Sequence, residues 1–134
     1  GARAGAFACA AYGVAMHQGH VNSIAAFIGG AAHQNLGRWS NAEQTAAFAK
    51  VADLRPEDVL MCSWQERTFE PAFCLAFCRE MRWLVLSVRG SIDWRACLTD
   101  AAADAVEIPG GFTHDGMLRG ARSILERTRS LLKA

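Results

Sequence analysis

Two apolar runs separated by a short polar segment restrict most strongly how this chain can fold. The first run is Pro71–Cys78 (PAFCLAFC), the second is Trp83–Arg89 (WLVLSVR), and the polar segment Arg79–Arg82 has the length of a hairpin loop. Both runs carry apolar side chains at successive positions, so both faces of the predicted hairpin are apolar. Because an isolated hairpin is only marginally stable in water, we predict that it lies inside a sheet covered by helices.

The flanking sequence predicts the helices and turns that accompany this hairpin. Ser40 and Glu43 have the spacing of a capping box, which predicts a helix over 41–52 with Phe48 and Val51 facing inward. The other expected elements are helices over 4–16, 96–105 and 115–133, a short helix at Pro56, an extended segment over 59–64 and a turn at 109–111. The last helix has apolar residues at helical spacing, with its arginines mainly outside the apolar stripe.

Composition is typical of a globular protein. The 134 residues are 51% hydrophobic and 20% charged, with a net charge of +1. This balance excludes a disordered chain and gives no indication of a nucleic-acid partner. We assign residues 1–55 to an apolar helical segment and residues 56–134 to an α/β domain. Because the chain starts at Gly1 and stops within a charged periodic segment, we expect it to be a piece of a longer protein.

Residues 4–37 contain no Asp, Glu, Lys or Arg, which raises the question of a membrane. The segment His17–His20 divides this stretch into two halves, each shorter than the roughly 20 apolar residues that a spanning helix needs. Two interpretations remain open, namely helices packed in a protein core and helices inserted shallowly at a membrane surface. The absence of Lys and Arg favours the first.

The cysteine pattern favours reduced, buried thiols. The five cysteines, at 9, 62, 74, 78 and 97, form no Cys-x-x-Cys pair and have no histidines at zinc-finger spacing. We therefore expect no disulfide framework, no structural metal and no cofactor. His17, His20 and His33 are expected to be solvated or packed.

The second apolar run ends at Arg89-Gly90-Ser91, and further short motifs surround this point. They are Ala10-Ala11-Tyr12-Gly13, Glu70-Pro71-Ala72-Phe73, Val88-Arg89-Gly90-Ser91, Leu98-Thr99-Asp100 and His114-Asp115-Gly116-Met117. In this order the motifs resemble the N-terminal half of the class 3 lipases, most closely the sn-1 diacylglycerol lipases. The resemblance covers about residues 59–134 and, faintly, 8–16. It implies an α/β fold, the N-terminal part of an α/β-hydrolase, with an apolar hairpin and a mixed sheet flanked by helices.

The resemblance also implies roles for individual residues. The backbone N–H and hydroxyl of Ser91 would stabilise the oxyanion of an acyl-transfer reaction, and Gly90 would let the backbone approach the substrate. The alternative is that Ser91 is an ordinary turn residue at the end of a strand. By the same resemblance, His114 is not the catalytic histidine and braces the loop entering the last helix. Three carboxylates in the region, Asp93, Asp100 and Asp104, are expected to cap helices or bind loop backbone.

The nucleophile of such a hydrolase is missing, because none of the seven serines lies in a Gly-x-Ser-x-Gly elbow. We therefore expect the chain alone to be inactive and the catalytic triad to lie outside it. The resemblance implies a complete protein that hydrolyses glycerolipid esters and is membrane-associated in the cell or an organelle. The alternatives are an inactive lipase-derived subunit of a larger membrane-associated complex, and an unrelated domain in which the motif occurs by chance. Either lipase interpretation leaves apolar faces for the rest of the chain or another subunit to cover.

Overall fold

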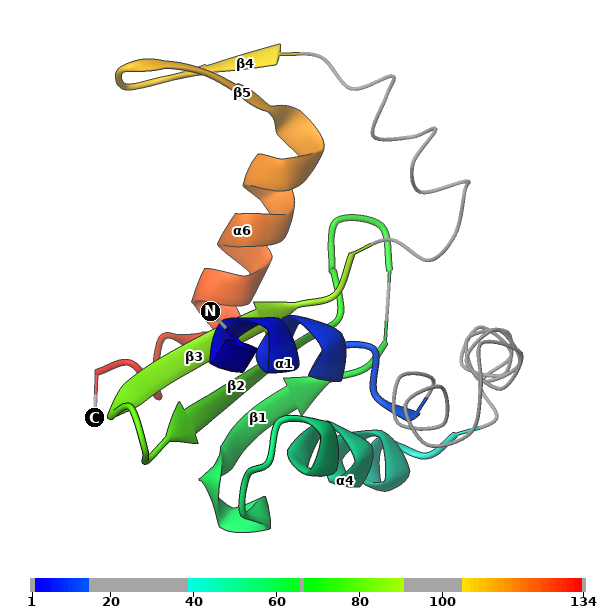
Figure 1. The fold of residues 1–134 in the computed structure, drawn as a ribbon. Helices are drawn as coiled ribbons and strands as arrows, with labels where there is room; N and C mark the ends of the chain where they lie inside the picture. The colour runs from blue at the N-terminus through cyan, green and yellow to red at the C-terminus, as the bar shows by residue number, and fades with distance from the viewer. Residues whose placement is uncertain (1, 15–38, 66, 91–104, 134) are drawn as a thin grey trace. The chain divides into compact units, whose positions relative to one another are not determined.

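The structure is a computed structural model that describes residues 2–14, 39–65, 67–90 and 105–133 (Figure 1). It contains helices and small antiparallel sheets. The helices are α1 (Ala2–Ala10), α4 (Asn41–Val51), the 3₁₀ turn η1 (Pro56–Asp58) and α6 (Asp115–Thr128). The strands are β1 (Val59–Ser63), β2 (Phe73–Cys78), β3 (Trp83–Val88), β4 (Ala105–Ile108) and β5 (Gly111–His114). The chain divides into two compact units, residues 1–64 with 72–89 and residues 65–71 with 90–134.

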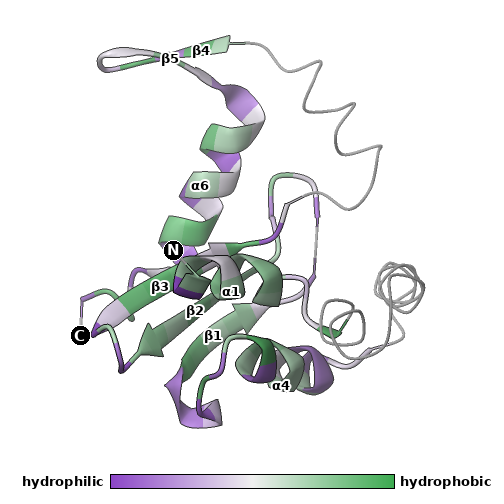
Figure 2. Ribbon diagram, in the orientation of Figure 1, coloured by the Kyte–Doolittle hydropathy of each residue, from purple (hydrophilic) through white to green (hydrophobic). Residues whose placement is uncertain are grey.

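The first unit is built on a three-stranded antiparallel sheet in the order β1-β2-β3. The predicted hairpin is confirmed, because β2 and β3 pair along their whole length from Phe73↔Val88 to Cys78↔Trp83. The predicted extended segment is also confirmed as β1, which pairs on the other side of β2 with a bulge between Val59 and Met61. The central strand is therefore β2, which is apolar along its length (green in Figure 2) and mostly buried.

Helices α1 and α4 cover one face of this sheet (Figure 1). Phe48 of α4 lies at the centre, with its ring 6.4 Å from that of Phe7 and 6.4 Å from that of Trp64. The facing residues of β2 are small: Cys74, Ala76 and Cys78 alternate along the strand and all are buried. Small side chains at these positions let the aromatic rings approach the sheet closely.

The opposite face of the sheet is also apolar. Leu84, Leu86 and Val88 alternate along β3 and are 46%, 47% and 47% exposed. Among the parts of the chain that the structure describes, β3 has no neighbour at its second edge. The prediction of a hairpin with two apolar faces is thus confirmed. Helices α1 and α4 cover one face, whereas on the other face Phe73 and Leu75 of β2 are buried and the residues of β3 are half exposed.

The start of α4 follows the predicted capping box. The Ser40 hydroxyl accepts a hydrogen bond from the Glu43 backbone N–H, and the Glu43 carboxylate accepts one from the Ser40 backbone N–H at 2.8 Å. These bonds satisfy N–H groups that the first turn of a helix leaves without partners. They also lower the pKa of Glu43, chiefly through its bond with the Ser40 backbone. The helix begins where the sequence predicts and ends at Val51.

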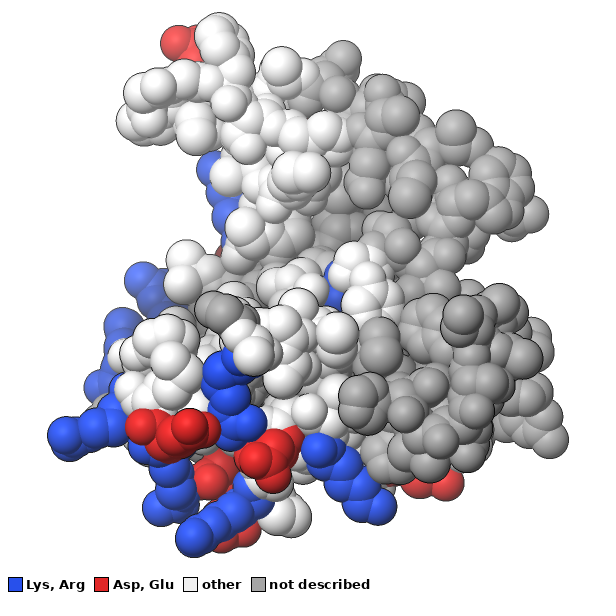
Figure 3. All heavy atoms as spheres, viewed as in Figure 1, with Lys and Arg blue, Asp and Glu red and all other residues white. Residues whose placement is uncertain are grey.

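An ion pair with two hydrogen bonds links η1 to Arg79, the residue that follows β2. The Arg79 guanidinium donates to both carboxylate oxygens of Asp58, at 2.7 and 2.9 Å, and Asp58 is buried. The hydrogen bond from Arg79 is the main reason that the pKa of Asp58 is lowered. Nearby, Arg3 of α1 forms ion pairs with Asp53 and Glu80. Positive and negative side chains are accordingly mixed at this end of the unit (Figure 3).

The second unit contains a hairpin that was not predicted. Strands β4 and β5 pair from Ala105↔His114 to Ile108↔Gly111, and the predicted Pro109-Gly110 turn joins them. Gly110 has φ +94°, the left-handed conformation that the third residue of a type II turn requires. With four residues each, the strands are too short for their alternation to stand out in the sequence. Helix α6 follows β5 directly and confirms the predicted amphipathic helix up to Thr128.

The remaining predictions concern the helices over 4–16 and 96–105 and a membrane span. The first helix ends at Ala10 instead of residue 16, and turns follow as far as Gly13. The helix predicted over 96–105 lies outside the described residues except for Ala105, which belongs to β4. In the described ranges, no helix has the length and apolarity needed to cross a bilayer.

Replacing Phe48 by Ala tests the assignment of the core. Because the ring is fully buried between Phe7 and Trp64, its loss should lower the free energy of unfolding by about 3–5 kcal/mol. Urea denaturation followed by circular dichroism measures this change. A matched substitution of the exposed Phe112 by Ala should cost less than about 1 kcal/mol. Equal losses in the two variants would contradict the proposed core.

Asp58→Asn should weaken the fold at neutral pH and flatten its response to acid. Since the pKa of Asp58 is lowered in the folded chain, its ion pair stabilises the fold above the unfolded pKa of about 3.9. That stabilisation is lost as the pH falls through the folded value. Thermal melts of wild type and variant should therefore differ at pH 7, and the difference should shrink as the pH falls below the unfolded value. The exposed neighbour in Glu57→Gln provides the control, and a constant difference between Asp58→Asn and wild type down to pH 2 would contradict the ion pair.

Candidate functional site

The candidate site is the end of β3, where the sequence places the Arg-Gly-Ser motif. Strand β3 ends at Val88, and the Arg89 backbone N–H still donates to the Ala72 carbonyl at 2.9 Å. Arg89 is buried, whereas Gly90 is exposed. The regular hydrogen bonding of the sheet therefore extends to Arg89, and the chain becomes accessible at Gly90. Ser91 lies outside the described residues.

Two of the motifs recognised in the sequence are brought together here. Phe73 and Val88 are register partners, so the last residue of the Glu70–Phe73 motif pairs with the first residue of the Val88–Ser91 motif, where β2 begins and β3 ends. The bond between Arg89 and Ala72 joins the same two motifs. Segments 15 residues apart in sequence thus fix the backbone that leads into Gly90. The backbone is therefore held by hydrogen bonds as far as Arg89.

His114 has a structural position. It is the N-cap residue of α6, and its Nδ1 accepts a hydrogen bond from the Met117 backbone N–H at 3.4 Å. This arrangement matches the prediction that His114 braces the entry to the last helix. Asp115 follows in the first helical turn and forms an ion pair with Arg119 at 2.7 Å. A carboxylate near a helix N-terminus and an i, i+4 pair both stabilise the helix.

The loop between β1 and β2 holds the same helix. The Arg119 guanidinium lies 4.8 Å from the centre of the Phe69 ring. At the next residue the helix passes close to Pro71, because a Cβ atom built on Gly120 would lie 3.4 Å from Cδ of the proline, at van der Waals distance. Phe69 and Pro71 thus form two adjacent contacts with the first half of α6.

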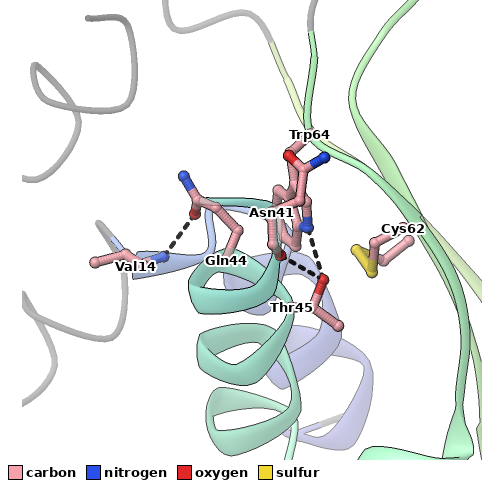
Figure 4. The surroundings of a disulfide bond; sticks show 7 residues. Val14, Asn41, Gln44, Thr45, Cys62 and Trp64 are labelled. Atoms are coloured by element: carbon pink, nitrogen blue, oxygen red, sulfur yellow. Dashed lines mark hydrogen bonds between the residues drawn. A yellow bond between two sulfur atoms is a disulfide. The ribbon is translucent and has the colours of Figure 1, made fainter. Parts of the chain in front are cut away.

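The cysteines correct one expectation. The prediction of reduced thiols is wrong for two of them, because Cys62 of β1 and Cys74 of β2 form a disulfide (Figure 4). Their positions explain the bond, because the two residues are direct register partners with Cα atoms 4.2 Å apart. The spacing of the cysteines along the sequence does not show this pairing of β1 with β2. Cys9 and Cys78 are free thiols, the first exposed and the second buried.

Polar groups next to this bond have structural roles. Trp64, two residues after Cys62, donates from its indole nitrogen to the Thr45 hydroxyl at 3.0 Å, and Thr45 donates to the Asn41 carbonyl (Figure 4). On the same helix, the buried Gln44 side chain accepts from the Val14 backbone N–H at 3.0 Å. The bond from Trp64 links α4 to the residue that follows β1, and the bond from Val14 links α4 to the chain that follows α1.

Other residues that the sequence analysis singles out lie outside the described part of the chain. Asp93, Asp100 and Asp104 lie outside the described residues, as do His17, His20 and His33. Within the ranges that are described, no three His, Cys, Asp or Glu side chains gather in a way that could hold a metal ion. The described part of the site is thus a backbone element, formed by the ends of β2 and β3.

Comparisons with models of known protein families, with curated proteins and with solved structures found no match to this chain.

His114→Ala should destabilise α6 because it removes the acceptor for the Met117 N–H. We expect a loss of about 0.5–1 kcal/mol in the free energy of unfolding, measured by urea denaturation. His114→Asn supplies a side-chain oxygen suited to the same position and should restore most of the loss. If both variants lose the same amount, His114 does not act as a cap.

Proposed function

We propose that this chain is the N-terminal part of a glycerolipid ester hydrolase of the class 3 lipase type. Its fold would be the corresponding part of an α/β-hydrolase. In this proposal the chain supplies the oxyanion-binding side of the active site, and the nucleophile, the acid and the base come from outside these 134 residues. The observation that carries the proposal is the way β3 ends, with its hydrogen bonding maintained to Arg89 and the chain exposed at Gly90.

The chemistry follows from the reaction that such a protein would catalyse. Attack of a serine on an ester carbonyl places negative charge on the carbonyl oxygen in the tetrahedral intermediate. A fixed N–H donor and a hydroxyl at Ser91 would stabilise that charge most when both are held before the reaction begins. The paired ends of β2 and β3 support such a role, because they restrict the backbone up to the residue before Gly90. Gly90 would allow the ester group to approach the backbone.

A second candidate function is supported by the apolar face of β3. Leu84, Leu86 and Val88 are about half exposed, and exposed apolar surfaces of this kind commonly mark contacts with other polypeptides. The chain would then be a lipase-derived, inactive subunit within a larger, membrane-associated complex. The two candidates share the N-terminal half of the lipase fold and differ in whether a catalytic half accompanies it. Under either proposal the complete assembly works at a membrane in the cell or an organelle.

The sequence of the transcript beyond Ala134 distinguishes the two candidates. An open reading frame that continues into a Gly-x-Ser-x-Gly elbow would support the hydrolase. A stop codon directly after Ala134 would support the subunit.

Ser91→Ala in the complete protein tests the role in oxyanion binding. Loss of one donor should lower kcat for a diacylglycerol or triacylglycerol ester by about 100- to 1000-fold while the fold is retained. Ser130→Ala, an exposed serine beyond α6, is the matched control and should leave the rate unchanged. An unchanged kcat in Ser91→Ala would contradict the assignment. In addition, the isolated 134-residue chain should not react with a fluorophosphonate probe, and labelling would show that it holds an activated serine.

A further inference from the structure

The Cys62–Cys74 disulfide closes a covalent ring of the chain, and the loop that contacts α6 is part of this ring. Cys62 and Cys74 are 12 residues apart in the sequence, and the bond links the last part of β1 to the first part of β2. The segment 65–71 therefore lies wholly inside the ring. Because a cross-link restricts the conformations of the residues that it encloses, the state of this bond affects the whole loop.

The enclosed loop has a tight and specific conformation. Arg67 and Glu70 exchange backbone hydrogen bonds of 3.1 and 2.9 Å. Between them, Phe69 has φ +61°, which is uncommon for a large side chain and must be maintained by its surroundings. This conformation places the Phe69 ring beneath the Arg119 guanidinium, and Pro71 packs against Gly120. The loop conformation and the anchoring of α6 thus depend on the same residues.

We propose that the Cys62–Cys74 disulfide is a redox-controlled clasp. Reduction by a dithiol opens it and weakens the contacts of residues 67–71 with α6. This proposal does not depend on the hydrolase proposal. It concerns the described residues alone and would hold for either candidate function.

The exposure of the two cysteines gives the direction of the reaction. Cys74 is fully buried, whereas Cys62 is partly exposed at the edge of the core, so Cys62 is the more accessible of the two residues for attack by an incoming thiolate. Attack forms a mixed disulfide between the reductant and Cys62 and releases the Cys74 thiolate, which takes up a proton. The second thiol of the reductant then displaces Cys62 as a thiolate, which is also protonated. Two electrons and two protons pass to the cysteines, and the dithiol becomes a disulfide.

The other described cysteines provide controls for this reaction. Cys78 lies on β2 four residues after Cys74 but is buried and free, and Cys9 lies exposed on α1. Neither lies between Cys62 and Cys74 in the sequence. Changing either one to Ser should therefore leave the redox response of the loop unaltered.

Peptide mapping of the full chain establishes the bond. Cleavage after Lys50, Arg67 and Arg79 gives peptides 51–67 and 68–79, which should be joined in the oxidised chain and separate after treatment with dithiothreitol. Because Cys78 shares the second peptide, the mapping is repeated with Cys78→Ser. Absence of the joined peptide in chain purified under air would overturn the proposal.

Hydrogen exchange and limited trypsin digestion then measure the effect of opening the bond. On reduction of the folded chain, amide exchange over 67–70 and 116–121 and cleavage after Arg67 should each accelerate roughly tenfold, while the amides of β2 and β3 stay protected. The Cys62→Ala/Cys74→Ala double variant should behave like the reduced chain under both redox conditions. Cys9→Ser should respond like wild type.

Three results would contradict the proposal that the disulfide is a redox-controlled clasp. The first is a bond that the dithiol cannot reduce while the chain stays folded, which would make it a permanent structural cross-link. The second is reduction that leaves exchange in the loop and in α6 unchanged. The third is loss of the far-ultraviolet circular dichroism signal on reduction, since the bond would then hold the whole fold together and not this loop alone.

Discussion

The pairing of β2 between β1 and β3 is the interaction on which the other features depend. The hydrogen-bonded register of this strand sets Cys74 opposite Cys62 and Phe73 opposite Val88. It also turns Ala76 and its small neighbours toward the aromatic rings of α1 and α4. If β2 moved by one residue relative to its neighbours, these side chains would change faces, and the core and the disulfide would both be lost. The position of Gly90 after the last paired residue follows from the same register.

The two apolar faces of the three-stranded sheet differ in how far they are covered. One face is covered by α1 and α4, whose rings fill the space above β2. The other face carries the half-exposed Leu84, Leu86 and Val88 on a strand whose second edge has no partner within the described part of the chain. Such an edge is a ready template for further pairing, and native proteins commonly cover it. Both proposed functions provide a cover, either more of the same polypeptide or another subunit.

The sequence predicted the elements with strong local signals. The apolar runs predicted β2 and β3, the Ser40–Glu43 spacing predicted the start of α4, and the apolar stripe predicted most of α6. Two features could not be predicted in the same way. The strands of the β4–β5 hairpin are too short for a clear alternation, and the Cys62–Cys74 bond depends on a pairing between strands that no spacing rule for single segments expresses. For the candidate site, the sequence located the end of the strand, whereas Ser91 itself lies beyond the described residues.

Hydrogen exchange of individual backbone amides at the end of β3, followed by NMR in the full chain, tests the central claim most directly. In the proposed site, the sheet holds the chain by hydrogen bonds as far as Arg89, and the Ser91 backbone N–H is available to donate to a ligand. The Arg89 amide should exchange as slowly as the buried amides of β2, and the Ser91 amide should exchange rapidly when no ligand is bound. A Ser91 amide as protected as that of Arg89 would mean that it is already used within a regular ladder, and this result would contradict the account.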